Sequence, residues 1–445
     1  MKDSCNRLAT LISALCLILF ISGCSANDNK DTLHSLYFPH IASNTKWDTE
    51  VCLINTSGIN PLKGTLTAFS DSGAQTSQKA VELAPHARVQ FIVSTDFTSP
   101  EGIGYMIFKA DAPDVAGYMK FYIESNYRGA IPAVARINTG SLSIPHIASN
   151  KKWWTGLSLL NTTNRPKTLT FEFNDGTTLT RTIDPNEHQK FSIKSLFPQA
   201  PRPDIKSGMI TGTSGVIGLM LIGSNPGVGN RYLGGMLLTD QTDTDLYFPH
   251  IARFKKWWTG IIVYNPSSSP ARLTIAPYRA NGNPLPPQTI DVAPETKYQK
   301  AAKDMKFEPG TAWFRVSSDQ AVTGLEIFGT KDHKRLGGYA CVNISKSRGV
   351  FPKLEKQGMT GIALVNIQDK PVTVTLEAFT DSGEKIASRS YPLNPHQKLI
   401  SPAQSLLPDD ISSATYIGYW ATHPVVGFQL NSSKDGMLLD ALPGL

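Results

Sequence analysis

The stretch LYFPHIA at residues 36–42 decides the interpretation of this chain, because it returns unchanged at residues 246–252. A related segment, IPHIASN, stands at residues 144–150, and a weaker copy, VFPKL, stands at residues 350–354. The prolines of the four segments are 106, 104 and 103 residues apart. Self-similarity with so long a period indicates that a whole domain is repeated along the chain. The sequence therefore predicts four tandem repeats of about 104 residues.

The similarity continues through each repeat. A Trp or Met is followed by Thr and by an alternating apolar stretch that ends in Asn, and a turn signal rich in Asp, Asn and Gly comes next. The aligned Asn residues are Asn55, Asn161, Asn265 and Asn366. Turns of this composition suit β-hairpins because these residues tolerate positive φ. The Asn side chains are expected to satisfy backbone groups of the loop that follows.

Short alternating segments between turns predict an all-β fold. In the third repeat, seven strands are expected at residues 246–252, 259–265, 271–278, 287–293, 311–317, 321–329 and 336–343. Seven short strands in about 100 residues are typical of an Ig-like β-sandwich. The predicted repeats span residues 36–140, 141–245, 246–348 and 349–445.

Two arrangements of the repeats are open. The joints between repeats are short, which favours a stiff linear array of sandwiches. A closed four-unit ring that resembles a propeller is the alternative, although each repeat has more strands than one propeller blade.

The first residues predict export from the cytoplasm. Residues 1–23 read as a signal peptide whose apolar core is too short to span a membrane. The segment ISGC at residues 21–24 resembles the lipobox of bacterial lipoproteins. That resemblance implies cleavage before Cys24, lipid on its thiol, and attachment to a membrane, with Ser25 favouring the outer membrane. Residues 24–35 are nearly devoid of apolar residues, which predicts a flexible tether.

Residues 36–445 resemble uncharacterised secreted or lipid-anchored bacterial proteins that carry tandem β-sandwich repeats. The resemblance rests on the PHIA and W-x-T-G segments, and it implies a fold and a location but no ligand. The formal net charge of +7 is mild for 445 residues and fits contact with anionic surface polymers. Because clustered basic segments are absent and the chain is exported, no nucleic-acid partner is expected.

Paired tryptophans beside lysines are the candidate ligand-binding residues. The segment KKWW occurs at residues 151–154 and again at 255–258, in the loop between the first two expected strands. Flat aromatic rings beside ammonium groups can stack on sugar rings and pair with acidic substituents. The candidates are Lys151, Lys152, Trp153, Lys255, Lys256 and Trp257. Three other tryptophans, Trp47, Trp154 and Trp258, are aligned with one another and are expected to pack within or between repeats.

The recurrent histidines raise the question of a metal. His40, His146 and His250 share one position in the repeat, where the fourth copy has Lys353. Three imidazoles can bind a metal ion, but repetition alone explains their recurrence. A structural role is expected, with a ring nitrogen bonded to a nearby carbonyl, and no metal site or cofactor is predicted.

Motif searches give no catalytic residues. The chain has no Gly-x-Ser-x-Gly elbow, no His-Glu-x-x-His segment and no Walker loop. The sequence therefore predicts a non-enzymatic, lipid-anchored envelope protein that serves as a binding or scaffolding array for a polysaccharide or a protein partner. The alternative is a hydrolase, or an accessory subunit, that acts on an extracellular polymer. The insertion FPQAPRPDIKS at residues 197–207 is the segment of interest for that alternative.

Overall fold

The computed structural model describes residues 33–124, 126–197, 204–225, 232–252, 257–331, 336–340 and 345–445, with only the backbone of 336–340. Leu33–Leu445 form one compact unit. Cys24, Lys255 and Lys256 lie outside the described residues, as does most of the predicted tether. No helix in the described ranges is long and apolar enough to cross a membrane.

The first repeat is a sandwich of two antiparallel four-stranded sheets, ordered β1-β6-β3-β4 and β5-β2-β7-β8. Two single-turn helices, α1 (Val93–Asp96) and η1 (Pro100–Gly102), lie between β5 and β6. The strands are β1 (His34–Phe38), β2 (Asp48–Asn55), β3 (Leu62–Phe69), β4 (Gln75–Leu83), β5 (Arg88–Ile92), β6 (Tyr105–Ala110), β7 (Val115–Ile123) and β8 (Tyr127–Pro132).

The second repeat has the same order of strands in its sheets, β12-β11-β14-β9 and β13-β10-β15-β16. Its elements are β9 (Leu142–Ile144), β10 (Trp153–Asn161), β11 (Lys167–Phe173), β12 (Thr178–Ile183), β13 (His188–Ser192), α2 (Ile193–Leu196), β14 (Gly208–Thr211), β15 (Val216–Ser224) and β16 (Leu233–Leu238).

In the third and fourth repeats one long strand runs through both sheets and joins them. In the third repeat this strand is β22 (Thr311–Thr330), and in the fourth it is β29 (Tyr416–Ser432). The other elements of the third repeat are β17 (Asp243–Phe248), β18 (Trp257–Tyr264), β19 (Ala271–Arg279), β20 (Gln288–Val292), β21 (Lys297–Ala301), η2 (Ala302–Asp304) and β23 (Leu336–Ala340). Those of the fourth are β24 (Lys346–Phe351), β25 (Met359–Asn366), β26 (Val372–Phe379), β27 (Lys385–Leu393), β28 (Lys398–Pro402), α3 (Ala403–Leu406) and β30 (Leu439–Pro443).

The all-β prediction is confirmed, but the expected strand list for the third repeat needs two corrections. The strand β21, with the sequence KYQKA, was missed because its residues show no apolar alternation. The strands expected at 311–317 and 321–329 are one continuous strand, because the polar residues between them stay extended and form no turn. Each sandwich therefore uses eight strand positions instead of seven.

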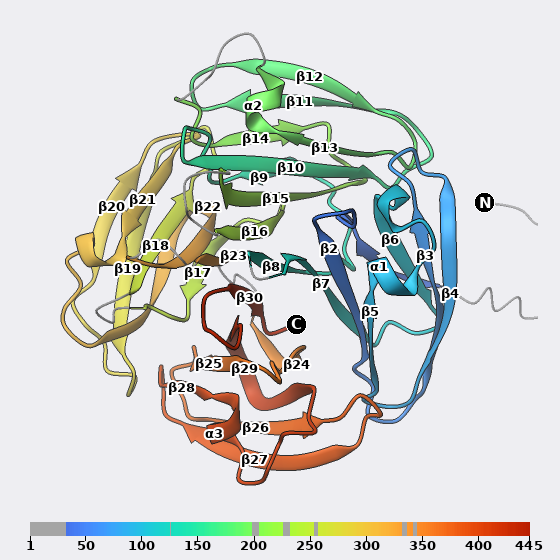
Figure 1. Cartoon of the computed structure of the whole chain (residues 1–445). Coiled ribbons are helices and arrows are strands. Elements are labelled where there is room, and N and C mark those ends of the chain that lie inside the picture. Colours follow the sequence, from blue (N-terminus) through green and yellow to red (C-terminus); the bar gives the residue numbers. More distant parts are fainter. Residues whose placement is uncertain are drawn as a thin grey trace, which may run out of the picture. The chain divides into compact units, whose positions relative to one another are not determined.

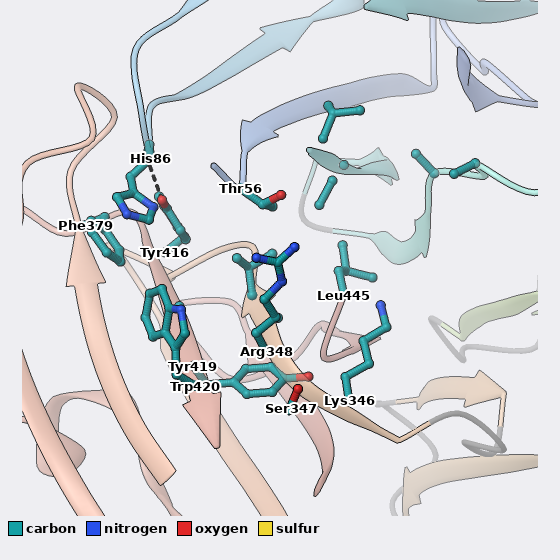
Figure 2. A pocket seen from close by; sticks show the side chains of 18 of the residues that line it. Thr56, His86, Lys346, Ser347, Arg348, Phe379, Tyr416, Tyr419, Trp420 and Leu445 are labelled. Atoms are coloured by element: carbon teal, nitrogen blue, oxygen red, sulfur yellow. Dashed lines mark hydrogen bonds between the residues drawn. The ribbon is translucent and has the colours of Figure 1, made fainter. Parts of the chain in front are cut away.

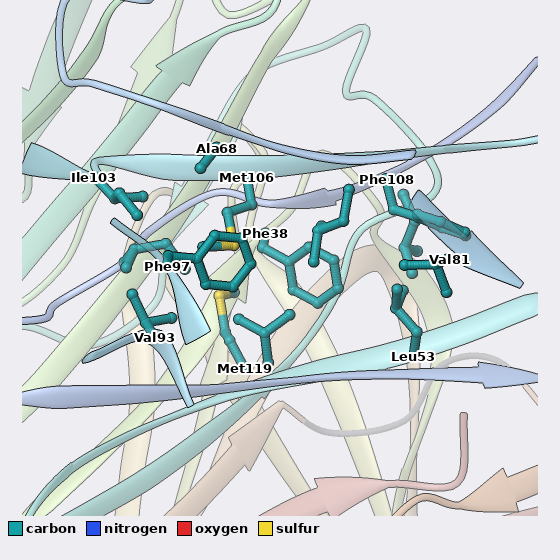
Figure 3. Close-up of a cluster of buried hydrophobic side chains, with 14 of the residues drawn as sticks. Phe38, Leu53, Ala68, Val81, Val93, Phe97, Ile103, Met106, Phe108 and Met119 are labelled. Atoms are coloured by element: carbon teal, nitrogen blue, oxygen red, sulfur yellow. The ribbon is translucent and has the colours of Figure 1, made fainter. Parts of the chain in front are cut away.

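The core of the first repeat lies between its two sheets. Figure 3 shows Phe38, Met106 and Met119 meeting there, with Leu53 from β2 close by. These side chains are fully buried, and burying a large apolar side chain contributes about 1.5–3 kcal/mol. The alternating pattern of the sequence thus places one face of each strand in this core.

The recurrent Asn residues have the predicted structural role. The Asn55 amide donates to the carbonyl oxygens of Asn60, Leu83 and Ala84 at 2.8, 3.2 and 3.0 Å. The amides of the other three make the same three bonds in their own repeats; they belong to Asn161, Asn265 and Asn366. Each amide therefore ties the end of one strand to the following hairpin.

The last strands of the four repeats meet in a closed cycle. The strand β8 lies against β16, β16 against β23, β23 against β30, and β30 against β8 (Figure 1). The fourth repeat therefore contacts the first as each other repeat contacts its successor. The closed arrangement, the alternative to a linear array, is the one that the structure has. Sandwiches can close in this way because each one contributes the edge strand of its inner sheet to the centre.

Candidate functional site

Successive repeats join through two recurring positions. The first is the residue after the Pro of the opening segment, and the second is the first residue of the short strand β5, β13, β21 or β28. The pairs are His40 Nδ1 with His188 Nε2 at 3.3 Å, His146 Nδ1 with Lys297 Nζ at 2.8 Å, and His250 Nδ1 with Lys398 Nζ at 2.9 Å. At the joint between the fourth and first repeats, which we call the closing joint, Arg88 Nε donates to the carbonyl oxygen of Pro352 at 3.1 Å.

The three histidines are therefore structural, but the expected partner was wrong. Each ring nitrogen meets a side chain of the next repeat instead of a nearby carbonyl, because ring closure brings a lysine or a histidine to it. Burial and the neighbouring Lys297 lower the pKa of His146 to about 3. Burial and Lys398 likewise hold the pKa of His250 well below its usual value. These two imidazoles are neutral near pH 7 and can accept a hydrogen bond from the lysine amino group, whose own pKa burial lowers to about 7 in both Lys297 and Lys398.

The joint between the first two repeats contains an arrangement that resembles a catalytic triad. Ser158 Oγ lies 2.7 Å from His188 Nε2, and His188 Nδ1 lies 2.8 Å from Asp71 Oδ1. However, Ser158 is only 2% exposed, and its hydroxyl also donates to the carbonyl oxygen of Pro39 at 3.3 Å. A nucleophile must reach its substrate, and although Ser158 borders a pocket between the first two repeats, this low exposure leaves its hydroxyl little access to that pocket.

The closing joint shows what this arrangement does. There Arg88 takes the place of His188, and it bonds Asp381 through both its backbone N–H and its guanidinium, at 2.9 Å each. His188 contacts Asp71 in the same two ways, with the backbone bond at 2.8 Å. We therefore assign the Ser158–His188–Asp71 contacts to the joint itself.

The joint between the fourth and first repeats also contains a buried cluster of charges. Glu50 accepts from Lys120 Nζ at 2.8 Å and from Lys353 Nζ at 2.7 Å, and the Tyr118 hydroxyl donates to the same carboxylate. Burial alone would raise the pKa of Glu50, but the two ammonium groups hold it below its usual range. A second set beside it joins Arg128 to Glu355 and Asp440.

This charged cluster is peculiar to the closing joint. The strand register pairs Glu50 with Lys120, whereas the equivalent pairs in the other repeats are Gly156 with Leu221, Gly260 with Ile327 and Gly361 with Leu430. Sequence reasoning missed the cluster. The available signal was the appearance of charges at positions that are neutral in the other copies.

The predicted Lys-Trp loops are only partly exposed. Lys151 and Lys152 are exposed, but the Trp153 ring is half-buried and stacks on Tyr232 with the centroids 5.0 Å apart. Trp257 is half-buried against an apolar cluster that includes Phe328. Two of the six candidates, Lys255 and Lys256, lie outside the described residues.

The structure also corrects the alignment of the tryptophans. The backbone N–H groups of Trp47 and Trp153 each donate to an Asn side chain three residues earlier, at 3.1 Å in both cases. Trp47 packs on Tyr127 as Trp153 packs on Tyr232. Trp47 is therefore equivalent to Trp153 and not to Trp154. The sequence spacing agrees, because Trp47 and Trp153 each lie eight residues after the Pro of the opening segment, so the match of Trp47 with Trp154 was wrong.

Trp154 and Trp258 pack against core clusters that include residues of the preceding repeat, as the packing interpretation expected, and each indole is also bonded within its own repeat. Trp154 Nε1 donates to the carbonyl oxygen of Ser224 at 3.1 Å, and Trp258 Nε1 donates to that of Thr330 at 3.3 Å. A Cβ on Gly223 would lie 2.5 Å from the Trp154 ring. Glycine at that position is what lets the indole lie flat on the neighbouring strand.

Trp47 and Trp154 line one pocket of about 370 Å³ between the first and second repeats, which we call the tryptophan pocket. Both indoles are half-buried, so each keeps a face toward this space. Phe121, Leu219 and Leu221 contribute apolar surface, and polar groups come from Lys190, Ser192 and His40. Lys190 Nζ is held by Asp71 at 2.8 Å. An aromatic, mostly apolar pocket with a few fixed polar groups is typical of small-molecule sites.

The insertion at residues 197–207 is described only at its ends. Lys206 donates its backbone N–H to Asn174 Oδ1 at 2.6 Å and accepts from Lys297 Nζ at 2.5 Å. Its C-terminal end thus belongs to the joint between the second and third repeats. Among the described residues, no three His, Cys, Asp or Glu side chains are grouped so that they could hold a metal ion.

No protein-family model matches the chain, and no curated protein matches it significantly. Among solved structures, one similar chain is a calcium-binding mutant of Bacteroides uniformis beta-glucuronidase 2, with a TM-score of 0.12 and 12% identity over 48% of this chain. This chain spans only 27% of that enzyme. A second is a tetra-tandem repeat in the extending region of a large adhesion protein, with a TM-score of 0.10 and 10% identity, covering 88% of this chain and 92% of that chain. With TM-scores this low, neither similarity supports a conclusion about this chain.

Proposed function

We propose that this protein is a non-enzymatic, lipid-anchored component of the bacterial cell envelope that binds a polysaccharide. The lipobox-like segment supports the anchor: Cys24 would carry the lipid, and the outer membrane is the location that Ser25 favours. The four joined sandwiches would form a rigid carrier beyond the tether.

The tryptophan pocket is the observation that carries the proposal. Its indoles come from two different repeats, so their spacing is fixed by a joint instead of a loop. The hydrogen bond of Trp154 to Ser224 and the packing of Trp47 on Tyr127 fix both rings before any ligand arrives. A fixed aromatic surface lowers the entropy cost of binding.

Lysines close to Trp154 in the chain and at the pocket support an acidic polymer as the ligand. Lys151 and Lys152 are exposed and precede Trp154 in the chain by three and two residues. Lys190, half of whose side chain is exposed, contributes a further ammonium group at the pocket. Sugar rings could stack on the indoles while acidic substituents meet these lysines.

The test is a screen of the purified protein on an array of bacterial and environmental polysaccharides. The variants Trp47→Ala and Trp154→Phe should weaken binding by about tenfold, because central aromatic residues dominate such interfaces. Trp153→Ala is the matched control, since it removes an indole that does not line the pocket. Loss of binding in Trp153→Ala alone would instead place the ligand on the exposed Lys-Trp loop, and no binding to any glycan would refute the proposal in favour of a protein partner.

A further inference from the structure

A second pocket lies at the closing joint, away from the tryptophan pocket. Its volume is about 580 Å³, and its walls come from the first and fourth repeats. Thr56, which follows the end of β2, lines this pocket, whereas Trp47, which precedes β2, lines the tryptophan pocket. The two pockets are therefore at opposite ends of the same strand.

Two cations from β24 extend into this pocket. Figure 2 shows Lys346 and Arg348, two residues apart on the strand, directed into the same space. Within the described part of the chain, the Lys346 ammonium makes no hydrogen bond or ion pair. Arg348 is 74% exposed and reaches Asp114 only at 3.6 Å. Lys346 is exposed to solvent at the rim of the pocket, and partial desolvation there lowers the pKa of its ammonium.

Aromatic rings form the adjoining wall. The His86 ring stacks on Phe379 with the centroids 4.4 Å apart, and Trp420 meets it edge-on at 6.1 Å. The Tyr416 hydroxyl fixes this wall by donating to the His86 carbonyl oxygen at 2.6 Å, across the joint. Figure 2 shows these side chains on one side of the pocket, with Arg348 beside them and Lys346 farther away, beyond Arg348.

We propose that this basic-aromatic pocket binds a carboxylated sugar, with the carboxylate on Arg348 and Lys346 and the sugar ring against Trp420. A guanidinium matches the two oxygens of a carboxylate, and the ammonium supplies a second charge. The aromatic wall offers a ring-sized apolar surface that an inorganic anion would leave unused. The site is separate from the tryptophan pocket and does not depend on the function proposed for it.

The size of the pocket favours an oligosaccharide over a single sugar. A neighbouring cavity of about 290 Å³ is lined by some of the same residues, among them Lys346, Ala133 and Leu445. Lys346 thus lies where the two spaces meet. A chain of two or three sugars could extend from one into the other with a carboxylate at this lysine.

The test is isothermal titration calorimetry of the full protein with trigalacturonate, its methyl ester, galactotriose and glucose 6-phosphate. Trigalacturonate should bind, and the ester and galactotriose should bind at least tenfold more weakly, because they lack the charge. Equal binding of the ester, no binding of trigalacturonate, or tighter binding of glucose 6-phosphate would overturn the assignment.

Variants locate the site. Arg348→Gln, Lys346→Gln and Trp420→Leu should each weaken trigalacturonate binding by about tenfold. Lys63→Gln is the matched control, because Lys63 is an exposed cation elsewhere, with 60% of its side chain accessible. An equal effect of Lys63→Gln would reduce the interaction to nonspecific charge attraction and overturn the proposal. Trp47→Ala should leave this binding unchanged, so that failure at one pocket is distinguished from failure at the other.

Discussion

Replacing Glu50 with Gln should strongly destabilise the closed arrangement of repeats. Glu50 is 3% exposed and lies within 2.8 Å of two buried ammonium groups, those of Lys120 and Lys353. Glutamine keeps the shape of the side chain but removes the carboxylate that both ammonium groups share, and leaves Lys353 with Glu355 at 3.7 Å. Removing one partner of a buried ion pair typically costs about 3–5 kcal/mol. Since domains are commonly stable by only about 5–15 kcal/mol, the loss should be easy to measure.

A compensated variant separates lost charge from lost packing. The combination Glu50→Gly, Lys120→Leu and Lys353→His gives this joint the residues that the second repeat and its neighbour use at the equivalent positions. Buried ion pairs can often be replaced by apolar residues at little cost. The triple variant should therefore recover most of the stability that Glu50→Gln loses.

Urea unfolding, followed by circular dichroism at pH 7, would measure both variants. The pKa of Glu50 is lowered in the folded state, so its stabilising contribution is complete above the pKa of an unfolded glutamate, about 4.3. It is lost as the pH falls through the lowered value. The gap between wild type and Glu50→Gln should thus be full at pH 6 and narrow in acid. A gap below about 1 kcal/mol at pH 7 would refute the reasoning, since that is the scale of an exposed pair.

Three further predictions concern single positions. Burial lowers the pKa of Lys398 to about 7 from 10.5, so the unfolded chain binds one more proton than the folded chain between these pH values, and stability should rise by up to about 1.4 kcal/mol per pH unit. Melting curves at pH 7.5 and 9 should show this rise for the wild type relative to Lys398→Met. The same change of stability with pH in both proteins would contradict the prediction. Gly73 and Gly176 both have positive φ, but a Cβ on Gly73 would lie 2.7 Å from the Asn186 carbonyl of the next repeat, whereas Gly176 has nothing within 4 Å. Gly73→Ala should therefore lower the free energy of unfolding by about 1–3 kcal/mol more than Gly176→Ala does. Equal losses of stability in urea would show that strain within the turn is the whole effect. Cys24→Ser should release the protein from membranes on fractionation, because each lipid methylene contributes about 0.8 kcal/mol to anchoring; a variant that still pellets with membranes would remove the anchor from the proposed function.

The sequence predicts the strands well where local chemistry decides them. Alternating apolar residues place Phe38 and Leu53 in the core, and the recurrent Asn55 marks the end of a strand by the bonds it makes. The strand β21 was missed because KYQKA is held by its partner β18 and carries no apolar period of its own. Its position depends on pairing, which local sequence does not encode.

The candidate sites were harder to predict because both pockets are made by pairs of repeats. Lys346 and His86 belong to the fourth and first repeats, and only closure brings them to one pocket. The sequence singles out the paired tryptophans, but which of them lie on the surface and which pack becomes clear only when the neighbouring repeat is placed beside them. A residue such as Lys353 gave the clearest hint, because it departs from a histidine that the other three copies share.

The charged closing joint has a consequence for synthesis of the chain. Lys353 meets Glu50 across 303 residues, so the first repeat emerges from the ribosome long before its partner exists. During that interval its unpaired face carries Glu50, Lys120 and Arg128 beside apolar residues. Nascent domains with wholly apolar exposed faces are prone to aggregation, whereas charges that are costly to bury without their partners discourage mispairing. The cluster would therefore keep the first repeat soluble until the fourth repeat has been translated.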